Sequence, residues 1–205
     1  MPRTTFLRTL IFGITSRCPL ACRHCSADAS PGRTEELDLP GLAVILAKIQ
    51  KRGLAQVQWS GGEPLCRFDD MLALTRGAAP GSDFWVLTSG KGLTEARARA
   101  MREAGITGIN LGLDHWEPDR HDKFRGSPGS HAAVREAARI ARAQGLLVAV
   151  TLCAMPDFIS GQNLRAYCEA AGEMGAVLIQ ALEPMPAGRL ADAGVRLDDG
   201  QIALL

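Results

Sequence analysis

Short apolar segments alternate along this chain with longer amphipathic segments, and this alternation restricts the fold more than any other feature of the sequence. The predicted strands lie near residues 10–15, 56–59, 84–88, 109–113, 147–152 and 177–182. Helix-length segments between the strands predict a parallel sheet with right-handed crossovers. Six units are too few for a closed eight-unit barrel. We therefore expect an α/β fold, an open partial (β/α)6 TIM-like barrel of parallel strands, with a doubly wound sheet as the alternative.

The expected helices have recognisable ends and apolar stripes. Asp38 is the expected N-cap of the first helix, and Gly53 is expected just beyond its end. Two later helices are expected to end before Gly145 and Gly175. Their predicted buried faces are Val134, Ala137, Ala138 and Ala141 in one helix, and Leu164, Tyr167, Cys168 and Ala171 in the other. Cys168 is thus predicted to be a buried structural thiol.

Length and composition favour one globular domain over residues 1–205. The chain is 46% hydrophobic and 22% charged, which predicts a substantial core, and its formal net charge of +1 does not favour nucleic-acid binding. No apolar run approaches the roughly 20 residues that a membrane helix needs, and the apolar run at the N-terminus is too short for a secretory signal. We expect a soluble, cytoplasmic protein that does not bind membranes.

Three of the six cysteines crowd into one loop, directly after the first predicted strand. Cys18, Cys22 and Cys25 have the spacing C-x-x-x-C-x-x-C. Thiolates are suitable ligands for an iron-sulfur cluster or for zinc. Three cysteines on a four-iron cluster would leave one iron open for chemistry. The alternative is a zinc loop, with His24 or a distant cysteine as the fourth ligand.

A glycine-rich turn ends the second predicted strand, on the same rim of the sheet. Its sequence is Ser60-Gly61-Gly62-Glu63-Pro64. Glycines allow a small molecule to approach the backbone closely, and the carboxylate can accept hydrogen bonds from a cationic amine. The alternative is an ordinary turn between a strand and a helix.

In this order and on successive strands, the two motifs closely resemble the radical S-adenosylmethionine (radical SAM) superfamily, over essentially the whole chain. The resemblance implies that Cys18, Cys22 and Cys25 hold a 4Fe-4S cluster, whose open iron is chelated by S-adenosylmethionine. It also implies that the turn Gly61, Gly62, Glu63 and Pro64 holds the amino group of that ligand, and that His24 lies near its adenine.

Further residues match family positions less closely. Ser89, in Thr88-Ser89-Gly90, resembles a turn that touches the cofactor, and Asp114 ends the fourth strand where the family often has Ser-x-Asp-Gly. Gly112 here replaces that serine, and His115 the glycine, which removes a hydroxyl contact. Residues 121–126 resemble a loop of members that mature peptides or tetrapyrroles. The alternative for this segment is a solvated charged loop, with Ser130 capping the next helix.

The resemblance implies reductive cleavage of S-adenosylmethionine to a 5′-deoxyadenosyl radical, fed by an external electron donor of flavodoxin or ferredoxin type. We expect an oxidoreductase or maturase whose substrate is a peptide or a tetrapyrrole-like precursor. There are two alternatives. One is an enzyme that installs a glycyl radical in a partner protein, and the other is a non-catalytic scaffold that binds a cluster or zinc. Because the tail after the sixth strand is short, we expect a large substrate or partner at the open side. The alternative is that this chain is a truncated core and that a longer natural chain covers the opening. Further candidates on the rim are Glu183, Met185, Cys66 and Cys153, although a structural thiol is the favoured interpretation of both cysteines.

Overall fold

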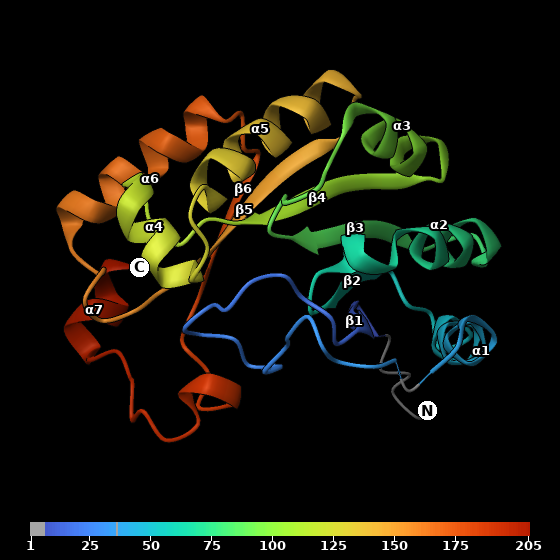
Figure 1. Ribbon diagram of the computed structural model, residues 1–205, viewed down its shortest axis with the longest axis horizontal. Helices are drawn as coiled ribbons and strands as arrows, with labels where there is room; N and C mark the ends of the chain where they lie inside the picture. The colour runs from blue at the N-terminus through green and yellow to red at the C-terminus, as the bar shows by residue number, and fades with distance from the viewer. Residues whose placement is uncertain (1–6, 36) are drawn as a thin grey trace, which may run out of the picture.

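The computed structural model describes residues 7–35 and 37–205. It contains one sheet of six parallel strands in the order β1 to β6, with most of the helices arranged along its outer side (Figure 1). The strands are β1 (Thr9–Thr15), β2 (Gln56–Gly61), β3 (Asp83–Thr88), β4 (Ile106–Gly112), β5 (Leu147–Cys153) and β6 (Leu178–Leu182). A doubly wound sheet reverses its strand order at a switch point, and this sheet does not. The open partial barrel is therefore confirmed.

All six predicted strands are present, and their boundaries move by at most three residues. The strand β4 begins at Ile106 because that residue pairs with Phe84 of β3. The strand β2 extends to Gly61 because that glycine pairs with Thr15 of β1. Parallel pairing brings the carboxyl ends of all six strands to one edge, where the loops that carry the candidate residues begin.

The helices are α1 (Leu39–Gln50), α2 (Phe68–Gly77), α3 (Glu95–Glu103), α4 (Pro118–Arg125), α5 (Ser130–Ala143), α6 (Gly161–Glu173) and α7 (Asp199–Leu204), with 3-10 turns η1 (Pro64–Arg67) and η2 (Gly188–Leu190). Asp38 caps α1 as predicted, since its carboxylate accepts the Gly41 N–H at 2.9 Å. The C-cap of α1 is Lys51, so the first residue beyond the helix is Arg52. Gly53, which was predicted at that position, lies one residue further along the chain. Local sequence signals thus place this helix to within a residue.

The segment predicted as a loop at residues 121–126 is largely helical, because it forms most of α4. Pro118 occupies the first turn of this helix, and Gly126 ends it with a left-handed φ of 60°. The alternative for this segment had Ser130 as the cap of the following helix, and this is also wrong, because the N-cap is Gly129. The capping group is the carboxylate of Asp122 in α4, which accepts the Ser130 hydroxyl at 2.9 Å and the His131 N–H at 2.8 Å. A carboxylate there stabilises the N-terminus of α5.

The core lies between the sheet and the helices. The predicted stripe of α5 is buried throughout, and in α6 Tyr167 and Ala171 are buried while Leu164 is half-buried. The prediction for Cys168 is wrong, because this thiol is exposed. Cys168 follows Tyr167 directly, so it lies about 100° further around the helix and outside the buried face of α6.

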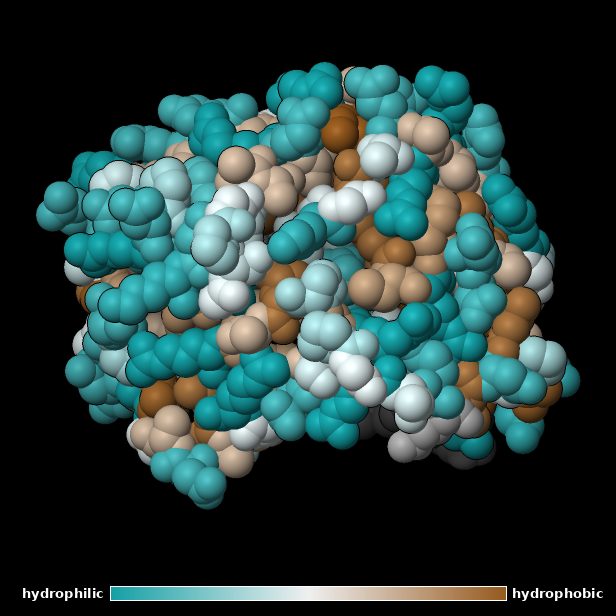
Figure 2. Space-filling view, in the orientation of Figure 1, coloured by the Kyte–Doolittle hydropathy of each residue, from teal (hydrophilic) through white to brown (hydrophobic). Residues whose placement is uncertain are grey.

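The sheet ends at β6, whose apolar side chains are uncovered. Val177, just before the strand, is 62% exposed, and Leu178 and Leu182 are 56% and 45% exposed. The face drawn in Figure 2 is mostly hydrophilic, with small separate hydrophobic patches. In the described part of the chain, the helices are too short or too polar to cross a membrane.

Candidate functional site

The three-cysteine loop leaves β1 and folds over the carboxyl end of the sheet. Cys18 and Cys22 are buried and Cys25 is half-buried. The Cys18 N–H donates to the Ser30 carbonyl at 3.2 Å, and the Ala29 N–H points at Cys25 Sγ from 3.4 Å. These contacts close the loop on itself, so that all three thiols line one cavity of about 270 Å³.

All but two of the predicted site residues line this cavity. They are Cys18, Cys22, His24, Cys25, Gly61, Gly62, Glu63 and Ser89. The exceptions are Pro64, which is buried at the start of η1, and Asp114, which lines two adjoining cavities. Sequence motifs on β1, β2 and β3 thus meet in one place.

Burial keeps the thiols of Cys18 and Cys22 protonated in the absence of a metal. It raises the pKa of Cys18 to about 11, with the nearby Glu63 carboxylate acting in the same direction. Burial also raises the pKa of Cys22, although the neighbouring Arg125 opposes this. A bound metal must therefore displace protons from these sulfurs, and the resulting negative charge must be compensated.

The donor set fits an iron-sulfur cluster better than a single zinc ion. Three free thiols surround one cavity, and cysteine thiolates are the usual ligands of such clusters. Among the described residues, no three His, Cys, Asp or Glu side chains lie close enough together to hold one ion. The three thiols line the wall of a cavity of about 270 Å³, which is larger than a single ion needs.

The Gly61-Gly62 turn packs tightly against the start of the cysteine loop. The Gly62 N–H donates to the Thr15 carbonyl at 2.7 Å, and the Glu63 N–H donates to the Arg17 carbonyl at 2.8 Å. Gly61 has a φ of 132°, and a Cβ at either glycine would overlap the backbone of Thr15 or Arg17. Glycine is therefore required here by the protein's own backbone, a reason that the sequence did not reveal.

The Glu63 carboxylate points into the protein and is 98% buried as a residue. One oxygen accepts the Thr88 hydroxyl at 2.6 Å and the Leu65 N–H at 3.2 Å. The other accepts the Ser89 hydroxyl at 2.6 Å and the Ser89 N–H at 2.8 Å. Because four protein donors already occupy it, the geometry does not support the predicted contact between this carboxylate and a ligand amine. Glu63 instead ties the end of β2 to the end of β3.

The helix α4 lies directly against the cysteine loop. The Arg23 N–H donates to the Phe124 carbonyl at 2.9 Å, and the rings of His24 and Phe124 stack with centroids 4.8 Å apart. Gly126, directly after α4, packs against the cysteine loop so closely that a Cβ there would lie 2.8 Å from the Ala21 carbonyl oxygen. The motif at residues 121–126 therefore positions the loop that carries the cysteines.

A buried ion pair links α4 to the end of β4. Arg125 Nε lies 2.5 Å from Asp114 Oδ2, and Arg125 Nη1 lies 3.9 Å from Cys22 Sγ. Gly112 is where the resembling pattern has serine, and a Cβ there would overlap the Arg125 guanidinium. The missing serine is thus explained, because an arginine occupies its space.

Arg189 of η2 holds the cysteine loop from the other side, and the sequence analysis did not identify it. Its guanidinium donates to the Cys22 carbonyl at 3.0 Å and to the Ala29 carbonyl at 2.7 Å, and it also contacts Asp28. The Arg189 N–H donates to the Cys25 carbonyl at 3.1 Å. No motif signals this contact, because Arg189 lies 160 residues or more from its partners in the sequence.

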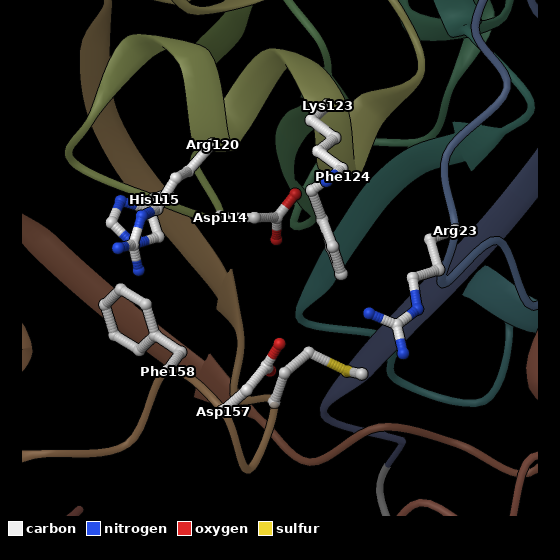
Figure 3. Close-up of a pocket in the computed structure, with 9 residues that line it drawn as sticks. Arg23, Asp114, His115, Arg120, Lys123, Phe124, Asp157 and Phe158 are labelled. Atoms are coloured by element: carbon white, nitrogen blue, oxygen red, sulfur yellow. The ribbon is translucent and has the colours of Figure 1, made fainter.

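A second cavity of about 370 Å³ lies between α4 and the loop after β5 (Figure 3). Arg23, Arg120 and Lys123 supply positive charge to its wall, while Phe124 and Phe158 supply aromatic surface. Asp157 and Asp114 add two carboxylates, of which Asp114 is paired with Arg125, and Arg120 also pairs with Glu117 at 2.6 Å. The cavity can therefore accept a ligand that has both apolar and anionic groups.

The remaining rim candidates separate into two groups. Cys153, Glu183 and Met185 line a small cavity of about 140 Å³ together with Asp114 and Arg125. Burial raises the pKa of Cys153 to about 12, so this thiol is a poor nucleophile at neutral pH. Cys66 is exposed and lines neither the cysteine cavity nor this small one.

Comparison with known proteins agrees with this geometry. The sequence model of the radical SAM superfamily matches residues 12–169. PqqA peptide cyclase of Ruegeria pomeroyi is 36% identical over 165 residues, which cover 80% of this chain and 43% of that protein. GTP 3',8-cyclase of Chlorobaculum tepidum is 31% identical over 119 residues, which cover 54% of this chain and 36% of that protein.

A solved structure shares the fold. Streptococcus suis SuiB, crystallised with its precursor peptide SuiA, matches with a TM-score of 0.78 at 14% identity, over 95% of this chain and 43% of that one. The chain thus spans less than half the length of these relatives. The family model matches most of the chain, the sheet forms an open barrel, and the three-cysteine loop lies at the carboxyl end of its strands. On these findings the chain belongs to the radical SAM superfamily of enzymes.

Proposed function

We propose that this chain is the catalytic core of a radical SAM enzyme that modifies a peptide, with a 4Fe-4S cluster on Cys18, Cys22 and Cys25. The observation that carries the proposal is the meeting of the three thiols with the Gly61-Gly62 turn in one cavity at the carboxyl end of the sheet. When bound and reduced by an external flavodoxin-type or ferredoxin-type donor, the cluster supplies the electron for cleaving S-adenosylmethionine to a radical that abstracts hydrogen from the substrate.

The chain's own residues position and shield this chemistry. The turn after β2 lines the cavity, and we assign the amine contact to its backbone carbonyl oxygens, since an amine donates hydrogen bonds and the Glu63 carboxylate is already occupied. Ser89 acts through Glu63, to which it donates two hydrogen bonds. His24, stacked on Phe124, forms a flat aromatic wall suited to a nucleobase.

The peptide assignment is supported by the relatives and by the second cavity. The relatives include a PqqA peptide cyclase, and SuiB was crystallised with a precursor peptide. The cavity between α4 and the loop after β5 combines aromatic walls with Arg23 and Lys123, which suits a peptide that carries acidic side chains. A tetrapyrrole precursor, also apolar and anionic, is the second candidate for this cavity.

Transfer of a labelled hydrogen tests the substrate class. Reconstituted protein is reduced with dithionite and supplied with S-adenosylmethionine and deuterated candidate peptides or tetrapyrroles. Deuterium in 5′-deoxyadenosine from a peptide, and none from a tetrapyrrole, supports the proposal. Deuterium from a tetrapyrrole only, or a stable glycyl radical on a partner protein detected by electron paramagnetic resonance, would replace it with one of the alternatives.

A further inference from the structure

We propose that the buried ion pair Arg125–Asp114 sets the reduction potential of the cluster, with Arg125 raising it and Asp114 lowering it. The inference rests on the proposed function, because it concerns the cluster held by Cys22. It assigns a role to Arg125 and Asp114, neither of which belongs to the three-cysteine motif or to the Gly61-Gly62 turn.

The pair is fixed against the cluster loop from three elements. Arg125 Nη1, at the end of α4, approaches Cys22 Sγ to 3.9 Å. Arg125 Nε lies 2.5 Å from Asp114 Oδ2, just after β4, and the other carboxylate oxygen accepts the Cys153 N–H of β5 at 3.0 Å. His121 accepts the Asp114 N–H at 3.1 Å. The charges therefore cannot move far from the sulfur without disrupting the fold.

The pair is also shielded from water. The Arg125 side chain is 12% exposed and the Asp114 side chain is 2% exposed. Charges at such positions interact more strongly than surface charges, because little solvent screens them. Gly112 leaves the room that the guanidinium fills, since any larger residue would overlap it. The sequence is thus adapted to hold a cation at this place.

A buried cation next to a cluster ligand favours the reduced state. Reduction takes one electron from an external low-potential donor and makes the cluster more negative by one charge. A cation near the ligating sulfur stabilises that added charge, and hydrogen bonds to sulfur act in the same direction. Asp114 opposes the effect but does not contact the sulfur.

Four variants, two of them with opposite expected signs, test the inference. Each protein is reconstituted anaerobically, and its midpoint potential is measured by dithionite titration followed by electron paramagnetic resonance. Arg125→Met is expected to lower the potential by at least about 59 mV, which is a tenfold change in the one-electron equilibrium. Asp114→Asn is expected to raise it, and the double variant is expected to fall between the two. Arg125→Lys keeps the charge and is expected to recover much of the wild-type value.

Arg189→Met is the matched control. This arginine also binds the cysteine loop, but it does so through the Cys22 and Ala29 carbonyls and is 26% exposed. Its loss is expected to weaken cluster retention and to change the potential less than Arg125→Met does. If the midpoint potential shifts equally in Arg189→Met and Arg125→Met, loosening of the loop explains both shifts, and the inference is overturned.

The outcomes separate the two proposals. Wild-type protein that binds no iron-sulfur cluster would refute the proposed function and this inference together. A wild-type cluster, with potentials that shift in the same direction in Arg125→Met and Asp114→Asn or that stay unchanged, would refute the inference alone. If Arg125→Met does not fold, Gly112→Ala displaces the guanidinium with both charges kept. It must then lower the potential while Asp114→Asn raises it.

Discussion

Replacing Glu63 with alanine should destabilise the fold, and the structure gives the size of the effect. The carboxylate is the acceptor for two buried backbone N–H groups, those of Leu65 and Ser89, and for the hydroxyls of Thr88 and Ser89. The hydroxyls can rotate toward other partners, but the two N–H groups cannot. Each buried donor without a partner costs about 1 to 3 kcal/mol, so we expect a loss of about 2 to 6 kcal/mol.

Such a loss is a large fraction of the total stability of a domain of this size, about 5 to 15 kcal/mol. The assay is urea unfolding of the metal-free protein under reducing conditions, followed by circular dichroism. Glu63→Gln keeps one oxygen and is expected to lose less. Glu169→Ala, on the exposed side of α6, is the control and should change the unfolding free energy by less than about 0.5 kcal/mol.

The refuting result is specific. If Glu63→Ala unfolds with the wild-type free energy but binds S-adenosylmethionine much more weakly, the carboxylate faces the ligand, as the sequence alone had suggested. The structure predicts the reverse order of effects, in which stability falls first and affinity falls because the turn after β2 loses its anchor on β3.

Three further predictions concern the cysteines and one histidine. Cys18→Ala should abolish the 4Fe-4S absorption after reconstitution, whereas Cys168→Ala should keep it, because the structure places that thiol on the surface. Iron loading should become tighter as pH rises toward about 11, since bound metal must displace the Cys18 proton; loading that does not change with pH in a buffered iron titration would contradict this. Burial lowers the pKa of His121 to about 4 from 6.5, so unfolded chains take up a proton more readily than folded ones between these values. Stability should therefore fall by about 3 kcal/mol as pH drops through this window, and His121→Asn should flatten that part of the urea-stability profile.

The fold was predictable because its signals are local and repeated. Each strand is a short apolar run, and Asp38 and Gly145 mark helix ends at positions that the structure confirms or nearly confirms. The short helix α4 was missed because six of its eight residues are charged or histidine, which hides the apolar periodicity. Its proline and glycine boundaries, Pro118 and Gly126, were the available signal.

The site was predictable as a set of residues but not as a set of contacts. The cysteine and glycine motifs follow neighbouring strands, so their meeting at one edge follows from a parallel sheet. Glu63 turns inward because donors on β3 and η1 surround it, and no pattern within its own motif reveals them. Arg189 reaches the loop from 160 residues away, and Cys168 is exposed because of how α6 is rotated. These are properties of packing, which a single sequence does not encode locally.

The most direct test of the account is cleavage of S-adenosylmethionine by the reconstituted chain. Protein loaded with iron and sulfide without oxygen is reduced with dithionite, given S-adenosylmethionine and assayed for 5′-deoxyadenosine by mass spectrometry, with Cys22→Ala as the control. We predict about four irons per chain, the nucleoside product from the wild-type protein and none from the variant. One tetrahedral zinc per chain, with no iron-sulfur absorption and no 5′-deoxyadenosine, would contradict it.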